Sequence, residues 1–174
     1  MLPTNAVSRQ LSATTPALMS SWLQHWNFTR LVTLTFNQPG DGMHHAIDGT
    51  AAFMRDRLYH FDARMNRRLI GRDWQRRPDN RMFHFFAPEK IQANPHWHGL
   101  VCFYRAAGEE LSRQHAIFDR HAKTIWGELA PKGTLDVKPV DDLLGGIDYV
   151  AKSLQTRVNW DHCIFPDQFW ATRL

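Results

Sequence analysis

Two short apolar segments, residues 82–89 and 96–103, constrain the fold of this chain more than any other feature of its sequence. Both are rich in the aromatic and aliphatic side chains that favour β-strands. The connector between them, residues 90–95, is too short for a crossover between parallel strands. The sequence therefore predicts an antiparallel β-hairpin.

The second strand of this hairpin begins with His96-Trp97-His98. Side chains of a strand alternate between its two faces at about 3.3 Å per residue, so the two imidazoles share a face about 6.6 Å apart. Trp97 then faces the other way. Two ring nitrogens at this separation can converge on one cation. The alternative is a pair of histidines that make only ordinary hydrogen bonds.

Glu89 ends the first strand, seven residues before His96, so the hairpin can bring its carboxylate beside the imidazoles. Two histidines and one carboxylate make a three-ligand site with open positions. We therefore expect Glu89, His96 and His98 to hold a divalent metal, Mg²⁺ or Mn²⁺, although Zn²⁺ fits the same donors. His84 is a competing third ligand, and an exposed loop carboxylate is the alternative for Glu89.

Further periodicities predict the elements around the hairpin. Residues 31–36 alternate between apolar side chains and threonines, which is typical of a half-buried strand. Apolar residues recur at helical spacing between Ile47 and Leu69, and Gly71 is the expected stop. We also expect a short helix over 17–25, a helix over 109–129, a strand over 134–140 and a helix from Asp141 or Asp142 to Leu154.

Tyr149 and Lys152 lie on the polar side of the last of these helices. Its apolar stripe includes Ile147, Val150 and Leu154, and at 100° per residue the centre of this stripe is about 150° from Tyr149. Lys152, three residues on, lies on the side of Tyr149. A phenol can act as a nucleophile, and a nearby ammonium can stabilise a phenolate or a phosphate. The alternative is an ordinary surface tyrosine.

The positive charge of the chain is concentrated in one segment. The net charge is +4, yet residues 55–81 contain nine arginines and four aspartates and so carry +5. Arginine binds phosphate through two parallel hydrogen bonds, which favours a polyanion such as nucleic acid as partner. The alternative is a solvated helix face with a basic loop. Contacts to a nucleic-acid backbone are expected from Arg64, Arg67, Arg68, Arg72, Arg76 and Arg77.

Several classes of protein are excluded by what the sequence lacks. Cys102 and Cys163 are the only cysteines, which argues against a disulfide framework and against a structural zinc site, so we expect a reducing, cytoplasmic environment. No apolar run is long enough to span a membrane, and we expect neither secretion nor membrane insertion. The absence of a G-x-x-x-x-G-K-[ST] motif excludes an ATP-driven helicase in this chain.

Three motifs in order resemble those of the HUH endonucleases, in particular the replication initiators of rolling-circle plasmids and viruses. These motifs are the strand Leu31-Val32-Thr33-Leu34-Thr35-Phe36, the histidine pair in Pro95-His96-Trp97-His98-Gly99, and Tyr149-Val150-Ala151-Lys152. They span about residues 31 to 156, most of the chain. Trp97 is larger than the aliphatic residue usual between the histidines, and the C-terminal tail matches no motif of the family.

The resemblance implies an α+β fold, with a central antiparallel sheet of about five strands flanked by helices, the RRM-like palm of the family. The histidine pair would lie on a middle strand, and the helix of Tyr149 would pack alongside. Three parts are expected: an N-terminal arm and short helix at 1–28, the nuclease domain at 29–157, and a docked tail at 158–174.

The resemblance also implies the chemistry. A metal ion on Glu89, His96 and His98 would polarise a DNA phosphodiester, and Tyr149 would attack phosphorus to form a 5′-phosphotyrosine and release a 3′-hydroxyl. The reaction is reversible, so the enzyme would nick and rejoin, with Lys152 stabilising charge.

The implied substrate is single-stranded DNA or a hairpin at a replication origin, with a helicase and a polymerase as further partners. Thr33, Thr35 and Asn37 are expected to line the DNA groove, and the arginines named above to contact the backbone. Four alternatives stay open: a transposase or a relaxase of the same chemistry, a non-catalytic nucleic-acid-binding module, and a metallohydrolase acting on a small phosphoester.

Overall fold

A computed structural model of the chain describes residues 16–37, 47–103, 106–155, 160–165 and 167–170. The fold is α+β, and the described residues form a single antiparallel sheet of four strands in the order β2-β3-β1-β4, where about five strands were expected. The strands are β1 (Arg30–Thr35), β2 (Phe83–Glu89), β3 (His96–Cys102) and β4 (Leu135–Pro139). β3, which carries the histidine pair, therefore lies inside the sheet.

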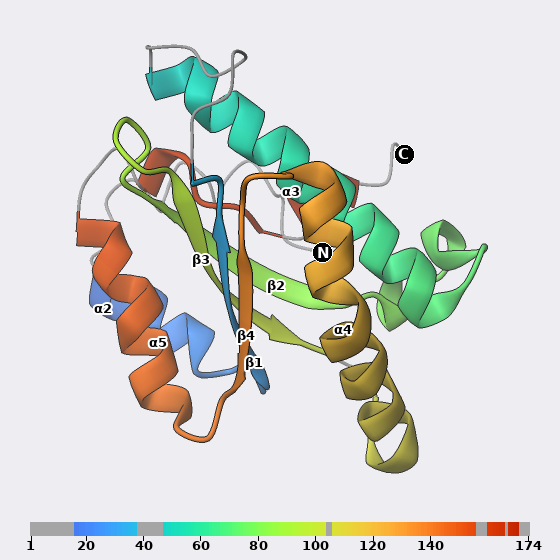
Figure 1. The fold of residues 1–174 in the computed structure, drawn as a ribbon. Coiled ribbons are helices and arrows are strands. Elements are labelled where there is room, and N and C mark those ends of the chain that lie inside the picture. The colour runs from blue at the N-terminus through green and yellow to red at the C-terminus, as the bar shows by residue number, and fades with distance from the viewer. Residues whose placement is uncertain (1–15, 38–46, 104–105, 156–159, 166, 171–174) are drawn as a thin grey trace.

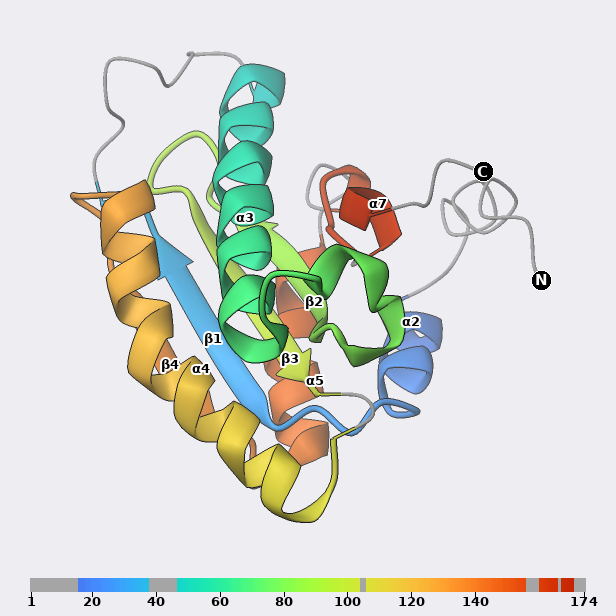
Figure 2. The ribbon, with the colours of Figure 1, turned by 90° about the vertical axis from the view of Figure 1, so that its right-hand side faces the viewer.

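Helices cover both faces of this sheet, α3 and α4 on one side and α2 and α5 on the other (Figure 1, Figure 2). The α-helices are α2 (Pro16–Leu23), α3 (Ile47–Ile70), α4 (Gly108–Leu129), α5 (Leu143–Lys152) and α7 (Asp167–Trp170). Three 3₁₀ turns are η1 (Trp74–Arg76), η2 (Pro78–Asn80) and η3 (Ser153–Gln155). Each helix and strand named from the sequence is present within a few residues. Within the described ranges, no helix has the length and apolar character needed to cross a bilayer.

The predicted hairpin is formed by β2 and β3, with Glu89 directly opposite His96. Strand alternation sends Trp97 to the α3 side, where it is fully buried and its indole Nε1 donates a hydrogen bond to the Met54 carbonyl at 3.3 Å. The neighbouring Leu100 packs on the other side, in the cluster that includes α5. The prediction that Trp97 faces away from the histidines is confirmed.

Gly99 explains how a bulky tryptophan fits inside β3. A Cβ atom at Gly99 would lie 2.2 Å from Cε1 of Phe86, closer than carbon atoms can approach. Phe86 instead lies over the bare glycine backbone and contacts the edge of Trp97, with ring centroids 6.5 Å apart. These contacts pack β3 from the face opposite the histidines.

Helix α3 buries one long stripe against the same face of the sheet. Its apolar residues at the predicted spacing, among them Met54, Leu58 and Phe61, are fully buried. The helix ends at Ile70 and is followed by Gly71, whose φ of +104° lies in the left-handed region that favours glycine. The predicted stop is confirmed.

The C-terminal segment contacts the body at the free edge of β2. Ile164 forms an isolated antiparallel bridge with Phe86, with N–H to O distances of 2.9 and 3.0 Å, and Phe169 packs against the core cluster below α3. The bridge shortens the exposed edge of the sheet. Of the N-terminal arm and short helix expected over residues 1–28, residues 1–15 lie outside the described residues.

Candidate metal and nucleophile site

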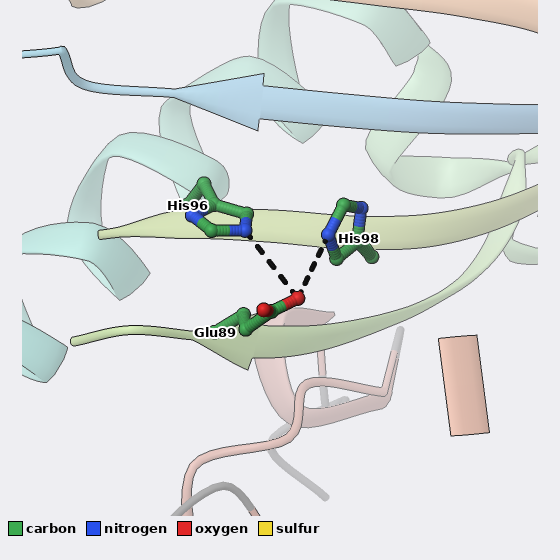
Figure 3. A group of neighbouring side chains, drawn as sticks. All are labelled: Glu89, His96 and His98. Atoms are coloured by element: carbon green, nitrogen blue, oxygen red, sulfur yellow. Dashed lines mark ion pairs between the residues drawn. The ribbon is translucent and has the colours of Figure 1, made fainter. Parts of the chain in front are cut away.

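Glu89, His96 and His98 lie together on adjacent strands and point to the same side of the sheet (Figure 3). Oε2 of Glu89 is 3.4 Å from Nε2 of His96 and 3.0 Å from Nε2 of His98. All three candidate ligand atoms lie within 4.8 Å of one another. The strand register of the hairpin therefore produces a group that could hold a metal ion.

The other nitrogen of each imidazole is already engaged. Nδ1 of His96 donates to the Asn94 carbonyl at 2.7 Å, because a carbonyl can only accept. Nδ1 of His98 lies 3.2 Å from the Thr33 hydroxyl, which can accept in the same way. When each ring carries its proton on Nδ1, both Nε2 lone pairs face Glu89, an arrangement that a bound cation would stabilise. The donor set thus fits a divalent metal.

Ser153 adds a contact to the third ligand. Its hydroxyl lies 3.4 Å from Oε2 of Glu89 and can donate to it, and the Ser153 side chain is buried where α5 passes into η3. Ligating carboxylates in proteins are often oriented in this way by a neighbouring donor. Each of the three candidate ligands therefore has one protein contact that fixes its direction.

Burial and charge favour the ligating forms of these groups. Burial, followed by repulsion from His96, lowers the pKa of His98 despite the attraction of Glu89. Burial alone would raise the pKa of Glu89, but the charges of His96, His98 and Lys90 outweigh it and hold this pKa below its usual value. The direction of both shifts favours the carboxylate of Glu89 and the neutral imidazole of His98, the forms that bind a metal ion.

Tyr149 is presented to this group by α5. The helix begins at Asp142, whose carboxylate accepts from the Gly145 amide at 3.1 Å, and it buries Ile147 and Val150 against the sheet. Tyr149 is 47 % exposed, on the side predicted from the sequence, and its ring centroid lies 4.8 Å from that of His98. The phenol is thus both solvent-accessible and adjacent to a candidate ligand.

A single open cleft of about 1000 Å³ contains these side chains. Tyr149, Lys152 and the three candidate ligands all line it, as does Lys90 directly after β2. Lys90 has a φ of +52°, an uncommon conformation for a residue other than glycine, and it was not predicted to be part of the site. The cleft therefore combines an accessible tyrosine, a possible metal site and two ammonium groups.

The three polar residues expected to line a DNA groove differ in position. Thr33 and Thr35 line the cleft, but the Thr33 hydroxyl contacts His98 and the Thr35 hydroxyl lies 2.8 Å from that of Thr134. Asn37 is exposed beyond the end of β1 and is not among the residues lining the cleft. Thr33 thus contacts a candidate metal ligand. The alternation of residues along β1 could not predict this contact.

The arginines expected to contact DNA lie away from the cleft. Ile47, at the start of α3, lines the cleft, whereas Arg64 and the arginines after it lie toward the opposite end of this helix and beyond it (Figure 1). Arg64 forms an ion pair with Glu128 at 2.8 Å. DNA binding by these arginines stays a prediction, and the arginines themselves do not lie beside Tyr149.

His84, the competing third ligand, faces the other side of the sheet. Its ring is fully buried and pairs with Asp62 of α3 at 3.1 Å. The sequence analysis also missed Ser153, although it lies four residues after Tyr149, a spacing that places both on one side of a helix. That spacing was a usable signal, whereas nothing in the sequence pointed to Lys90.

Comparison with protein-family models, with curated proteins and with solved structures gave no match to this chain. Its function is therefore inferred from the cleft and the residues that line it. Those residues include a tyrosine, two lysines, two histidines and a glutamate. This combination is suited to chemistry on a phosphate ester.

Proposed function

We propose that this chain is a metal-dependent endonuclease that nicks and rejoins single-stranded DNA through a covalent bond to Tyr149. The main support is the contact between Tyr149 and His98, with ring centroids 4.8 Å apart in a shared cleft. An exposed tyrosine that only makes an amphipathic helix soluble has no need of such a neighbour. The same side chain was singled out from the sequence for lying opposite its apolar stripe.

The donor set supports a divalent cation at Glu89, His96 and His98, with Mg²⁺ or Mn²⁺ as the expected ions. Such an ion, when bound, would supply Lewis-acid polarisation of a phosphate oxygen. The residues Thr33, Asn94 and Ser153 would orient the ligands, because each contacts one of them.

Tyr149 is the nucleophile of the proposed reaction. Its phenolic oxygen forms a bond to phosphorus as the bond from phosphorus to the 3′-oxygen breaks. The phenol loses its proton to solvent, and the leaving oxygen takes one up to become a 3′-hydroxyl. Lys152 lines the same cleft and would stabilise the phenolate or the phosphate charge. The phosphotyrosine is itself a phosphodiester, so attack by a 3′-hydroxyl reverses the step and reseals the strand.

A role in rolling-circle replication of a plasmid, phage or related mobile element is supported by the resemblance to HUH endonucleases. An internal β3 with α5 packed over it agrees with the arrangement that this resemblance implies. The substrate would be an unpaired strand or a hairpin at the origin, since in-line attack needs a backbone that can bend into the cleft. A helicase and a polymerase of the host or the element, in the cytoplasm, would complete the process.

A labelled single-stranded oligonucleotide library with Mn²⁺ tests this proposal. The parent chain should form a covalent protein–DNA adduct that survives denaturation, and Tyr149→Phe should form none, because phenylalanine has no oxygen. Tyr59→Phe is the matched control, since Tyr59 lies in α3, packs on Phe169 at 5.6 Å between centroids, and is not among the cleft residues. It should form the adduct as the parent does.

Two results would contradict the proposal. Undiminished cleavage by Tyr149→Phe would mean that water is the nucleophile, as in a metallohydrolase. Binding of the library without any adduct would instead indicate a nucleic-acid-binding module.

A further inference from the structure

A cluster of arginines lies in the last turn of α3 and in the segment that follows it. We call Arg67, Arg68, Arg72, Arg76 and Arg77 the arginine surface, and all five side chains are exposed. Residues 67–77 contain a single acidic residue, Asp73, so their charge is +4, which equals the net charge of the whole chain. Among the described residues, no carboxylate forms an ion pair with any of the five guanidinium groups.

The backbone beneath the arginine surface is held in place. Trp74 is buried between the flanking arginines, with 6 % of its surface exposed, and the guanidinium of Arg81 lies 5.3 Å from the centre of its ring. Arg81 also donates to the carbonyls of Trp74, at 3.2 Å, and of Gln75. A charged surface on a fixed turn loses less conformational entropy when it binds a rigid partner than a mobile loop would.

The arginine surface is remote from the cleft. Ile47 lines the cleft and Arg67 lies twenty residues later in the same helix, a separation of about 30 Å at 1.5 Å per residue. In addition, α3 covers one face of the sheet while α5, with Tyr149, covers the other (Figure 1, Figure 2). At about 3.4 Å per nucleotide, DNA reaching both places needs roughly nine nucleotides.

The arginine surface has charge but no stacking platform. Proteins that bind single strands combine a basic groove with exposed aromatic rings on which bases stack. The exposed large apolar side chains of the described residues are Leu18, Trp22, Leu144 and Tyr149, and none lies in the arginine surface. Its own tryptophan, Trp74, is buried. Such a surface suits the outer phosphate backbone of a duplex, which offers charge without open bases.

We propose that the arginine surface binds the phosphate backbone of duplex DNA next to the unpaired strand attacked by Tyr149. This deepens the proposed function and rests on it for the nature of the polyanion. Contacts to phosphate carry no sequence information, so the arginine surface holds the duplex in position while the cleft acts on the single strand.

The test measures affinity for a labelled duplex of about two helical turns by fluorescence anisotropy over a series of salt concentrations. Divalent metal is left out, so nothing is cleaved. The variant is Arg72→Gln/Arg76→Gln/Arg77→Gln. The slope of log K against log salt is negative, and each lost phosphate contact makes it less steep by about 0.9, so three lost contacts should make it less steep by about 2.7. The matched control is Arg120→Gln/Lys123→Gln/Lys132→Gln, three exposed cations on or just after α4, and it should keep the parent slope.

Three outcomes would overturn the proposal. An unchanged slope in the arginine variant would mean that these residues touch no phosphate. Equal losses in variant and control would mean that only total charge matters. A larger loss for single-stranded DNA or duplex RNA than for duplex DNA would assign the arginine surface to another polyanion. Because no cleavage is measured, the two proposals can fail separately. A chain that forms the Tyr149 adduct but fails here loses only duplex binding by the arginine surface. A chain that passes here but forms no adduct keeps the duplex-binding surface and loses the chemistry assigned to Tyr149.

Discussion

Two histidines on neighbouring strands of this protein each contact a carboxylate at almost the same distance. His84 of β2 lies 3.1 Å from Asp62, and His98 of β3 lies 3.0 Å from Glu89. The first pair is buried under α3, with 0 % and 1 % of the side chains exposed, whereas Glu89 is 34 % exposed and opens to the cleft. The difference between a structural pair and a possible metal site is therefore access rather than distance.

The second nitrogen of the ring separates the two pairs further. In the cleft, Nδ1 of His98 contacts the Thr33 hydroxyl, which directs Nε2 at Glu89. In the buried pair, Nδ1 of His84 has no hydrogen-bond partner among the described residues, and Phe86 and Phe169 lie against the ring. Apolar packing alone surrounds Nδ1 of His84, whereas a hydroxyl orients the ring of His98 toward Glu89.

The largest expected effect is on stability. Asp62 is buried and also accepts from the Asn66 amide at 3.1 Å, so Asp62→Ala leaves two buried groups without their partner. We expect it to lower the free energy of unfolding by about 3–5 kcal/mol. Glu89→Ala, at a partly exposed position, should cost about 1 kcal/mol or less. Urea denaturation without divalent metal measures both, and equal losses would mean that burial does not distinguish the pairs.

Stabilisation by a bound metal ion should depend on the cleft pair and not on the buried pair. A ligand at about one hundred times its Kd stabilises a protein by about 2.7 kcal/mol, so Mn²⁺ at that concentration should raise the stability of the parent chain by this amount. His98→Ala should lose the increment. His84→Ala should be less stable than the parent without metal but should still gain the increment from Mn²⁺, because His84 lies on the other face of the sheet. Loss of the increment in both variants would contradict the assignment of the ligands.

Much of this contrast could be predicted from the sequence. Once the hairpin places Glu89 opposite His96, strand alternation puts residues an even number of positions before Glu89 on its face. His84 lies five positions before it and must face the other way, so the register alone excludes it as a ligand. The lengths of the helices and the orientation of Tyr149 also followed from periodicity, since both depend on local burial.

Contacts between distant segments could not be predicted in this way. Asp62 lies within the apolar stripe of α3, but its partner His84 is twenty-two residues further along, and only the packing of α3 on β2 joins them. The sequence revealed the positive charge of the arginine surface. Its distance from Tyr149, however, depends on the direction in which α3 crosses the sheet. Pattern within one element does not fix that direction.

A smaller effect on metal affinity should come from Thr33. Thr33→Val removes the hydroxyl that contacts Nδ1 of His98, and loss of such an orienting contact weakens metal binding by about tenfold or more. Thr33→Ser should restore the affinity. Thr35→Val is the matched control on the same strand, because the Thr35 hydroxyl contacts Thr134 and no histidine. Titration with Mn²⁺ reports the affinity, and ¹⁵N spectra of the His98 ring report which nitrogen carries the proton.

If the ¹⁵N spectra of the parent place the His98 proton on Nε2 in the metal-free chain, the orienting role of Thr33 is wrong. The same conclusion follows if Thr33→Val and Thr35→Val weaken Mn²⁺ binding equally, since then any change in β1 would suffice.

The smallest effect concerns pH, and it follows from burial of His98. Its pKa in the folded chain is lowered, first by burial and then by His96, so the unfolded chain binds this proton more readily. Stability of the metal-free chain should therefore fall as pH decreases from about 6.5, by less than one proton's worth of slope, until the folded His98 is also protonated. His98→Asn should flatten this part of the profile.

His115→Asn is the control, since it removes a ring on the other face whose pKa is also lowered. It should flatten the profile less, because His115 is less buried than His98. Urea denaturation at a series of pH values gives the slopes. Parallel profiles for the parent and His98→Asn would contradict the prediction, because they would show that protonation of His98 does not change the free energy of unfolding.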